Sequence, residues 1–237
     1  MKNKILTIGF EGLHRAGKGT QIKMFSKYLI ERGIPSLITR GDGSRAGMNL
    51  APYDLHSTWW QGNLAYFKQE PISIGEKKEK ADIKYQRLNR EAKIIGKRTL
   101  PNLMRKENKN LGVMLMDRTF ISRFFFCKQI DSTVSLDESL KVYDPNNRQV
   151  EIIMPDLTFI LDAPKETLLN RISKEECNPE KCDFKTKIIS SHYDLFNETC
   201  SELRDRKNVY LINATNSLEE IHQEVLKYCK PFIFKNE

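Results

Sequence analysis

Short apolar runs alternate along the chain with longer stretches in which apolar residues recur every three or four positions. The short runs lack the polar alternation of a half-exposed strand, so they predict parallel strands that are buried on both faces. The longer stretches predict amphipathic helices. We place strands at residues 5–10, 36–39, 113–116, 157–161 and 209–212, and helices at 18–32, within 77–106, and at 165–174, 185–204 and 218–228.

This order of strand, helix and strand predicts an α/β fold with a five-stranded, mostly parallel sheet flanked by helices in three layers. No internal repeat or low-complexity linker interrupts the chain, so we expect a single domain over residues 1–237. Residues 41–75 and 131–154 are the least regular parts, and such segments often carry substrate contacts.

Composition narrows the class of protein. Hydrophobic residues make up 39% of the chain and charged residues 30%, and no apolar run approaches the roughly 20 residues needed to span a bilayer. We therefore expect a protein that does not enter the membrane. The odd number of cysteines has no framework spacing, which predicts reduced thiols and a cytoplasmic location. The five are Cys127, Cys177, Cys182, Cys200 and Cys229.

The net charge of +8 is concentrated in one part of the chain. Residues 68–109 contain thirteen Lys or Arg and six Asp or Glu, a local excess of +7. Such a segment attracts anions, whether nucleotides or a nucleic-acid backbone. The alternative is a solvated helical face, because charges of both signs are interspersed in it.

The strongest motif follows the first predicted strand and precedes the first predicted helix. Residues 12–18 read G-x-x-x-x-G-K, which is the phosphate-binding loop of P-loop NTPases in its required context. Gly12 and Gly17 let backbone N–H groups turn toward phosphate oxygens, and the helix N-terminus favours negative charge. Lys18 is expected on the β- and γ-phosphates of ATP. Gly19 follows it, so Thr20 is the candidate hydroxyl ligand for Mg²⁺.

Residues 10–21 as a whole resemble the opening of thymidylate kinases, which read E-G-x-D-x-A-G-K-[ST]-T-Q. The resemblance implies an ATP- and Mg²⁺-dependent nucleoside monophosphate kinase. In family members with an arginine inside the loop, that arginine neutralises the transferring phosphoryl group, and Arg15 has the matching place. His14 stands where the family has an aspartate that touches the acceptor's sugar. Ala16 completes the loop on the donor side.

A second motif ends the third predicted strand. Asp117 and Arg118 lie where ligands collect in an open α/β sheet, so Asp117 could hold Mg²⁺ and Arg118 could bind the acceptor's phosphate. Alternatively, Asp117 caps the next helix and Arg118 pairs with a neighbouring acid. The pair resembles the D-R-Y-x-x-S segment of thymidylate kinases, with Thr119 in place of the tyrosine and Ser122 retained.

Further residues are assigned by the same resemblance. Phe126 falls near the family's base pocket, and Arg45 and Arg90 fall near arginines that contact the acceptor. Residues 155–172 and 209–222 resemble the family's fourth strand with its lid-bearing helix and its last strand and helix. Asn213 and Ala214 would then line the adenine side. Arg171 either stacks on the adenine or forms a surface ion pair, and residues 173–187 form a lid that contains lysines but no arginine.

The function predicted from these motifs is transfer of the ATP γ-phosphoryl group to a nucleoside monophosphate, with dTMP favoured. A deoxynucleoside kinase is the nearest alternative, since Asp117 and Arg118 also resemble that family's E-R-S. A P-loop polyphosphate kinase and a nucleotide-binding protein with a regulatory or nucleic-acid role are further alternatives. We expect no nucleic-acid partner, because the basic segment falls where acceptor-binding arginines are expected. The family resemblance implies a homodimer.

Overall fold

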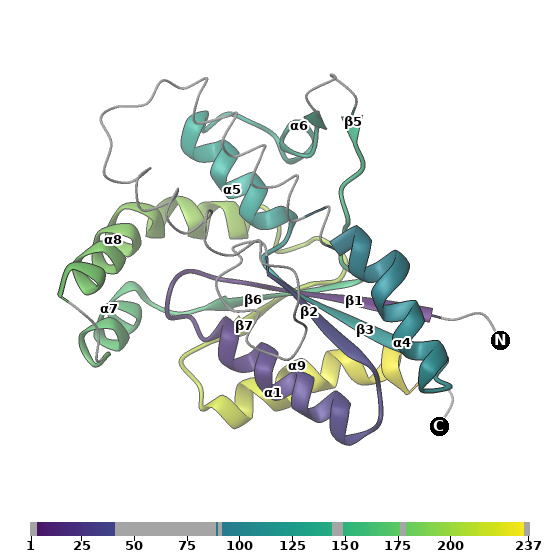
Figure 1. The fold of residues 1–237 in the computed structure, drawn as a ribbon. Coiled ribbons are helices and arrows are strands. Elements are labelled where there is room, and N and C mark those ends of the chain that lie inside the picture. The colour runs from purple at the N-terminus through teal and green to yellow at the C-terminus, as the bar shows by residue number, and fades with distance from the viewer. Residues whose placement is uncertain (1–3, 41–88, 90–91, 144–148, 176–178, 235–237) are drawn as a thin grey trace.

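The computed structural model describes residues 4–40, 89, 92–143, 149–175 and 179–234. A parallel sheet of five strands in the order β2-β3-β1-β6-β7 forms its centre (Figure 1). The predicted α/β class and all five predicted strands are confirmed, with each strand boundary within two residues of its expected place. The strands are β1 (Lys4–Glu11), β2 (Ser36–Arg40), β3 (Leu111–Asp117), β6 (Leu157–Asp162) and β7 (Val209–Asn213).

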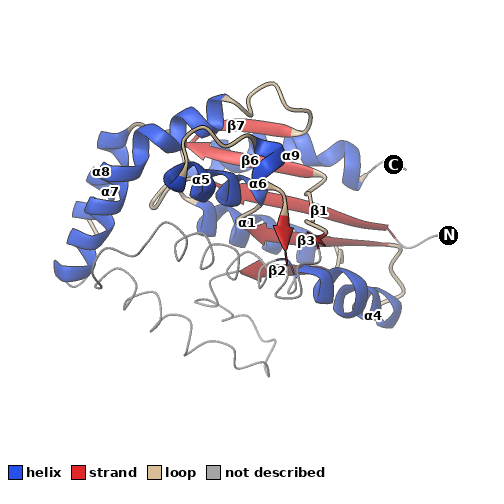
Figure 2. Cartoon of the chain, turned by 90° about the horizontal axis from the view of Figure 1, so that it is seen from above, coloured by secondary structure: helices blue, strands red, loops and turns tan. Residues whose placement is uncertain are grey.

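Helices cover both faces of this sheet, as Figures 1 and 2 show. On one face lie α1 (Lys18–Glu31) and α9 (Leu218–Ile233), which pack against each other. On the other face lie α4 (Leu100–Lys106) and α5 (Phe120–Ile130), and α8 (Pro179–Ser201) packs on α5. The sheet is therefore the middle of three layers, and its strands are apolar because both faces are covered.

Alternation along β3 divides the core between the two faces. Val113 and Leu115 belong to the main core, which includes the apolar side of α1. Met114 and Met116 belong to a smaller core with Leu100 of α4. Side chains that alternate between the two faces of the sheet are what strand geometry requires. Because both faces are buried, the residues on each side are apolar, and the strand reads in the sequence as an unbroken apolar run.

Two segments differ from the expected elements. Helix α8 begins at Pro179 rather than at residue 185, and it packs against α7 (Lys165–Ser173). Proline and an acidic residue suit the first turn of a helix, so Pro179 and Glu180 allow the longer helix although this stretch lacks an apolar stripe. The second stretch, expected to be irregular, contains α6 (Leu136–Ser139) and a small hairpin of β4 (Val142–Tyr143) and β5 (Gln149–Val150). A π-helical turn, η1 (Ile95–Thr99), precedes α4.

The prediction of five reduced cysteines is wrong in one respect. Cys182 is disulfide-bonded, whereas Cys127, Cys200 and Cys229 are reduced and buried. Cys177 lies outside the described residues. Within the described part of the chain, no helix has the length and apolarity that a bilayer crossing requires.

Candidate nucleotide-binding site

The loop at residues 12–17 joins the end of β1 to the start of α1, as the motif requires. Gly12 has φ +140°, and a Cβ atom there would lie only 2.6 Å from the carbonyl oxygen of Leu161. Gly17 has φ +98° and directly precedes the first residue of α1. Both positions need glycine because their φ angles are positive. At Gly12 there is a second reason, since the loop approaches β6 closely. No side chain caps the start of α1, so its N-terminus suits an anion.

Lys18 folds back over this loop. Its ammonium donates hydrogen bonds to the carbonyl oxygens of Gly12, at 2.7 Å, and Leu13, at 3.1 Å. The charge therefore lies at the concave side of the turn in which phosphate oxygens would be held. Ala16 is buried beneath the loop, whereas Gly19 is half-buried and Thr20 is exposed on the first turn of α1.

Arg15 has a left-handed backbone conformation, with φ +67°, in the middle of the loop. Its guanidinium forms an ion pair with the Glu175 carboxylate, two residues beyond the end of α7. A non-glycine residue with positive φ is uncommon and is often retained at a functional site. The charge of Arg15 is thus directed from the loop toward the region between α7 and α8.

Arg171 makes two contacts that the sequence did not indicate. Its guanidinium donates to the backbone carbonyl oxygens of Arg15, at 3.1 Å, and Ala214, at 2.6 Å. One side chain of α7 therefore ties the phosphate loop to the turn after β7. Because both acceptors are backbone atoms, this link fixes the relative position of the two segments whatever their side chains are.

The second motif lies beside the phosphate loop. Asp117 pairs with Phe10 across the β1–β3 ladder, and the Arg118 N–H donates to the Phe10 carbonyl oxygen at 3.1 Å. Both Asp117 and Arg118 are half-buried. The capping alternative for Asp117 is wrong, because the side chain of Thr119 caps α5 and accepts from Ile121 N–H at 3.2 Å.

Arg118 also has a left-handed backbone, with φ +87°. Its guanidinium donates to the Ser122 hydroxyl at 3.3 Å and lies 3.9 Å from a carboxylate oxygen of Glu11. The alternative in which Arg118 pairs with a neighbouring acid is therefore confirmed, and that acid is Glu11. A quarter of its side chain remains exposed, so the guanidinium still reaches the surface at the carboxyl end of β3.

Glu11 was missed by the sequence reasoning, although it organises this corner of the site. Its side chain is fully buried and accepts hydrogen bonds from the N–H and hydroxyl groups of both Thr119 and Ser122. A buried carboxylate is tolerated only when such donors compensate for the lost hydration. Glu11 thereby holds the start of α5 against the end of β1. A charged residue that ends a buried strand just before a glycine loop is the signal that could have identified it.

Magnesium binding is compatible with this arrangement. Among the described residues, no group of three or more His, Cys, Asp or Glu side chains could hold a metal ion. Mg²⁺ at phosphate-transfer sites needs no such cluster, because it takes one or two protein carboxylates and completes its shell with phosphate oxygens and water. Asp117 can supply such a carboxylate, because it is only half-buried and lies beside the phosphate loop.

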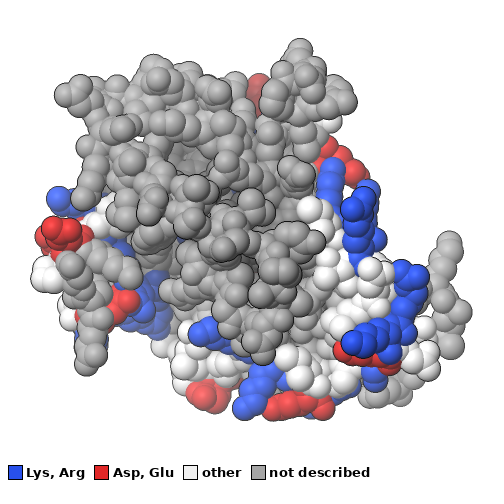
Figure 3. Space-filling view, viewed as in Figure 1, with Lys and Arg blue, Asp and Glu red and all other residues white. Residues whose placement is uncertain are grey.

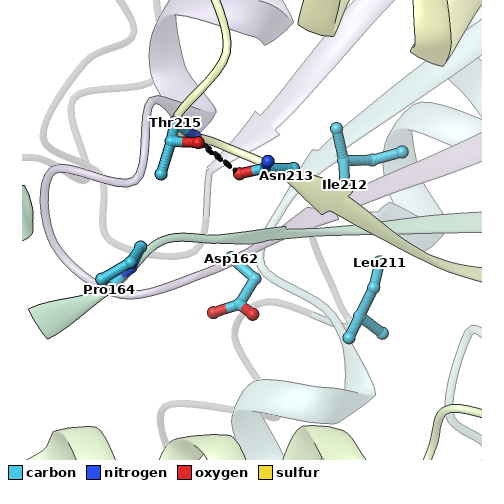
Figure 4. Close-up of a pocket in the computed structure, with 6 residues that line it drawn as sticks. All are labelled: Asp162, Pro164, Leu211, Ile212, Asn213 and Thr215. Atoms are coloured by element: carbon cyan, nitrogen blue, oxygen red, sulfur yellow. Dashed lines mark hydrogen bonds between the residues drawn. The ribbon is translucent and has the colours of Figure 1, made fainter.

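A hollow of about 430 Å³ opens at the carboxyl ends of β6 and β7. Asn213 and Thr215 form its upper side in Figure 4, where the Asp162 carboxylate points away from both of them. The Asn213 side chain accepts from the Thr215 N–H at 3.0 Å and from its hydroxyl at 2.7 Å, which rigidifies the turn. The remaining lining residues are Pro164, Leu211 and Ile212.

The expected acceptor side is only partly within the described residues. Phe126 is half-buried in α5, with its ring centroid 5.7 Å from that of Phe125. His14 is half-buried in the phosphate loop. Arg45 and Arg90 lie outside the described residues, so their expected contacts with the acceptor stay predictions.

The described part of the basic segment is an exposed surface. Lysines and arginines lie along α4 in Figure 3, with acidic side chains beside them. Those that are exposed on η1, on α4 and just after it are Lys97, Arg98, Arg105, Lys106 and Lys109. Their exposure favours the alternative in which the basic segment is a solvated helical face.

Comparison with known proteins identifies the family. The family model for thymidylate kinase matches residues 95–225, more than half of the chain. The thymidylate kinase of Clostridium novyi is 27% identical over 96% of this chain and 100% of its own. That of Kosmotoga olearia is 23% identical over 93% of both chains, and that of Carboxydothermus hydrogenoformans is 28% identical over 73% of this chain and 71% of its own. The chain belongs to the thymidylate kinase family and is a nucleoside monophosphate kinase.

Proposed function

We propose that the protein transfers the γ-phosphoryl group of ATP to dTMP, which forms dTDP and ADP. The single observation that carries this proposal is the phosphate loop at residues 12–18, with its glycine geometry and with Lys18 folded over it. Family membership supports the choice of a nucleoside monophosphate, and of dTMP among them.

On the donor side, the loop amides and Lys18 bind the β- and γ-phosphates, and Arg15 neutralises the charge that spreads over the transferring group. The adenine lies against the turn at residues 213–215, beside the hollow and on the side that Arg171 ties to the loop. Arg171 acts on ATP through the backbone positions that it fixes. Ala16, Gly19 and Thr20 complete the donor side.

On the acceptor side, Arg118 binds the dTMP phosphate, and Arg45 and Arg90 are proposed to assist it. His14 lies toward the deoxyribose, and Phe126 lies toward the base. An oxygen of the dTMP phosphate attacks the γ-phosphorus in line with the bond to ADP, which breaks as the new bond forms. No strong general base is needed, because a phosphate monoester with a second pKa of about 6 is already anionic at neutral pH.

Enzymes of this family use ATP together with Mg²⁺. Asp117 would hold the ion, directly or through water, and the exposed hydroxyl of Thr20 is the second candidate ligand. When bound, the ion would supply positive charge that offsets part of the negative charge of the phosphates. The contribution of the chain itself is to align the two phosphates and to supply Lys18 and Arg15.

The assembly around this site is also proposed by likeness to the family. The chain would act as a single nucleotide kinase domain over residues 1–237, as a homodimer and in the cytoplasm. Its lid would comprise the end of α7 and the first turns of α8, within residues 173–187. A lid over the phosphates would exclude water from the γ-phosphoryl group and so prevent simple hydrolysis of ATP.

An ADP-release assay with Mg-ATP tests this function. The acceptor panel is dTMP, dUMP, UMP, CMP, AMP, thymidine and polyphosphate, with ATP alone as the blank. We expect the highest kcat/KM with dTMP. Turnover of none of the monophosphates would contradict the proposal, and turnover of thymidine alone would identify a deoxynucleoside kinase.

A further inference from the structure

Glu175 connects the phosphate loop to both helices beyond it. Its carboxylate pairs with the guanidinium of Arg15 and with the ammonium of Lys185, which lies in α8. Both cations contact the same oxygen atom, Oε2. One carboxylate therefore draws a loop cation and a helix cation to one point at the mouth of the phosphate loop.

The backbone of Glu175 is anchored where this contact requires it. Its N–H donates to the carbonyl oxygen of Ile172 at 2.9 Å, so the residue continues the last turn of α7. Ile172 is buried in the main core, and α7 packs along α8. The position of the Glu175 backbone thus follows from helix packing, and the carboxylate extends from this fixed point to the two cations.

Exposure distinguishes the three charged groups from ordinary surface pairs. The side chain of Lys185 is only 13% exposed, that of Glu175 24% and that of Arg15 34%. Desolvated charges interact more strongly than exposed ones, so each group needs a partner of opposite sign here. Phosphate oxygens are anionic as a carboxylate is, so a polyphosphate ligand can take the place of Glu175 as the partner of both cations.

We propose that Glu175 is an exchangeable counter-ion, and that Lys185 is a second catalytic cation beside Arg15. When ATP binds, its phosphate oxygens replace the carboxylate, and Arg15 and Lys185 both turn to the γ-phosphoryl group. Before that, Glu175 holds the two cations at the place where they are needed and keeps them from repelling each other. This inference rests on the proposed function, because it assigns Lys185 to the same phosphoryl transfer.

The roles of the two residues are separable by experiment. Glu175 competes with ATP for the cations, so Glu175→Gln should tighten Mg-ATP binding by about two- to fivefold, the effect expected from losing partly exposed ion pairs. Lys185→Ala should lower kcat with dTMP by about tenfold or more, as expected for a lost transition-state cation, while the KM for dTMP changes little. Lys185→Arg keeps the charge and should retain most of the activity.

Calorimetry of Mg-ATP binding and steady-state kinetics measure these effects, with Lys207→Ala as the control. Lys207 is an exposed lysine in the turn before β7, outside the lid, and its loss changes the net charge by the same amount. Thermal unfolding first checks that each variant is folded. Weaker ATP binding by Glu175→Gln, or equal kcat in Lys185→Ala and Lys207→Ala, would overturn the proposal. The ATP titration needs no acceptor, so it tests the exchange even if dTMP is not the substrate.

Discussion

Arg15 combines two properties that rarely coincide in one residue. Its backbone is left-handed, which costs free energy for a residue with a Cβ atom, and its charge is directed out of the phosphate loop. A residue whose only role was structural would be replaced by glycine at no cost to the turn. The strain is therefore explained if the guanidinium itself is needed at this place.

Replacing Arg15 with alanine should lower kcat by about a thousandfold, the loss expected for an internal arginine in phosphoryl transfer. The dissociation constant of Mg-ATP should rise much less, because the loop amides and Lys18 remain. Stopped-flow measurement of a single turnover, together with ATP titration, distinguishes the two effects. Arg105→Ala, which removes an exposed arginine of α4, is the control. Unchanged turnover in Arg15→Ala would show that another residue carries this role.

Gly12 places a separate steric constraint on the same loop. A Cβ atom at Gly12 would meet the backbone of β6, and its φ of +140° is strained for any other residue. Gly12→Ala should therefore lower the free energy of unfolding by about 1–3 kcal/mol and weaken ATP binding. Urea denaturation with and without ATP measures both effects.

Gly96 is the matched control for that substitution. It lies in a helical turn, and the nearest atom of the described residues to a Cβ there would be the end of the Met114 side chain, at 3.8 Å. Gly96→Ala should leave stability unchanged or raise it slightly, because alanine favours a helix. If both variants were equally stable, the close approach of Gly12 to β6 would not constrain the loop.

At the scale of elements, the sequence predicts what depends on neighbouring residues. The five strands and the two loop glycines are readable because burial patterns and backbone conformations are local properties. Glu11 was missed because its partners Thr119 and Ser122 are more than 100 positions away in the chain. Glu175 was missed for the same reason: only packing of α7 and α8 beside the loop brings its carboxylate to Arg15.

The packing of α5 on α8 includes a buried charge that has the same long-range origin. Lys128 of α5 is 5% exposed at its side chain and pairs with Glu198 and Glu202 of α8. Burial alone lowers the pKa of a lysine, but the hydrogen bonds to Glu202 and Glu198 outweigh it, so the pKa of Lys128 is raised. The two carboxylates are about half exposed and remain hydrated without the lysine.

Because the lysine is buried and the two carboxylates are exposed, removing the carboxylates should cost more stability than removing the lysine. The double variant Glu198→Gln and Glu202→Gln leaves a buried cation without anions and should lower the free energy of unfolding by about 1–3 kcal/mol. Lys128→Met should cost less, because it removes the buried charge and keeps the volume. Urea denaturation at pH 7 compares them. A larger loss in Lys128→Met would mean that the attraction between the charges, and not desolvation, dominates this contact.

At the scale of the whole molecule, two histidines, the buried His222 and the half-buried His192, link stability to pH. His222 of α9 packs edge-on against the rings of Phe25 and Tyr28 of α1, and His192 of α8 packs against Phe125 of α5. Burial lowers the pKa of both imidazoles below the ordinary value of 6.5. Both helical layers on the two faces of the sheet therefore contain a histidine that is more easily protonated after unfolding.

The sign of the effect follows from proton linkage. Between the lowered pKa of the folded state and the value of 6.5, the unfolded chain binds more protons, so stability rises with pH in this window. The free energy of unfolding should fall as the pH is lowered from about 7.5 to about 5.5. Urea denaturation at constant ionic strength should show that decline in the parent and a shallower one in the double variant His192→Gln and His222→Gln.

The capping carboxylates of Glu138 and Glu220 do not account for this decline. Their pKa values are lowered, so they lose their contribution to stability only below their ordinary value of 4.5. An equal decline in both proteins would assign the acid sensitivity to the growing net positive charge instead.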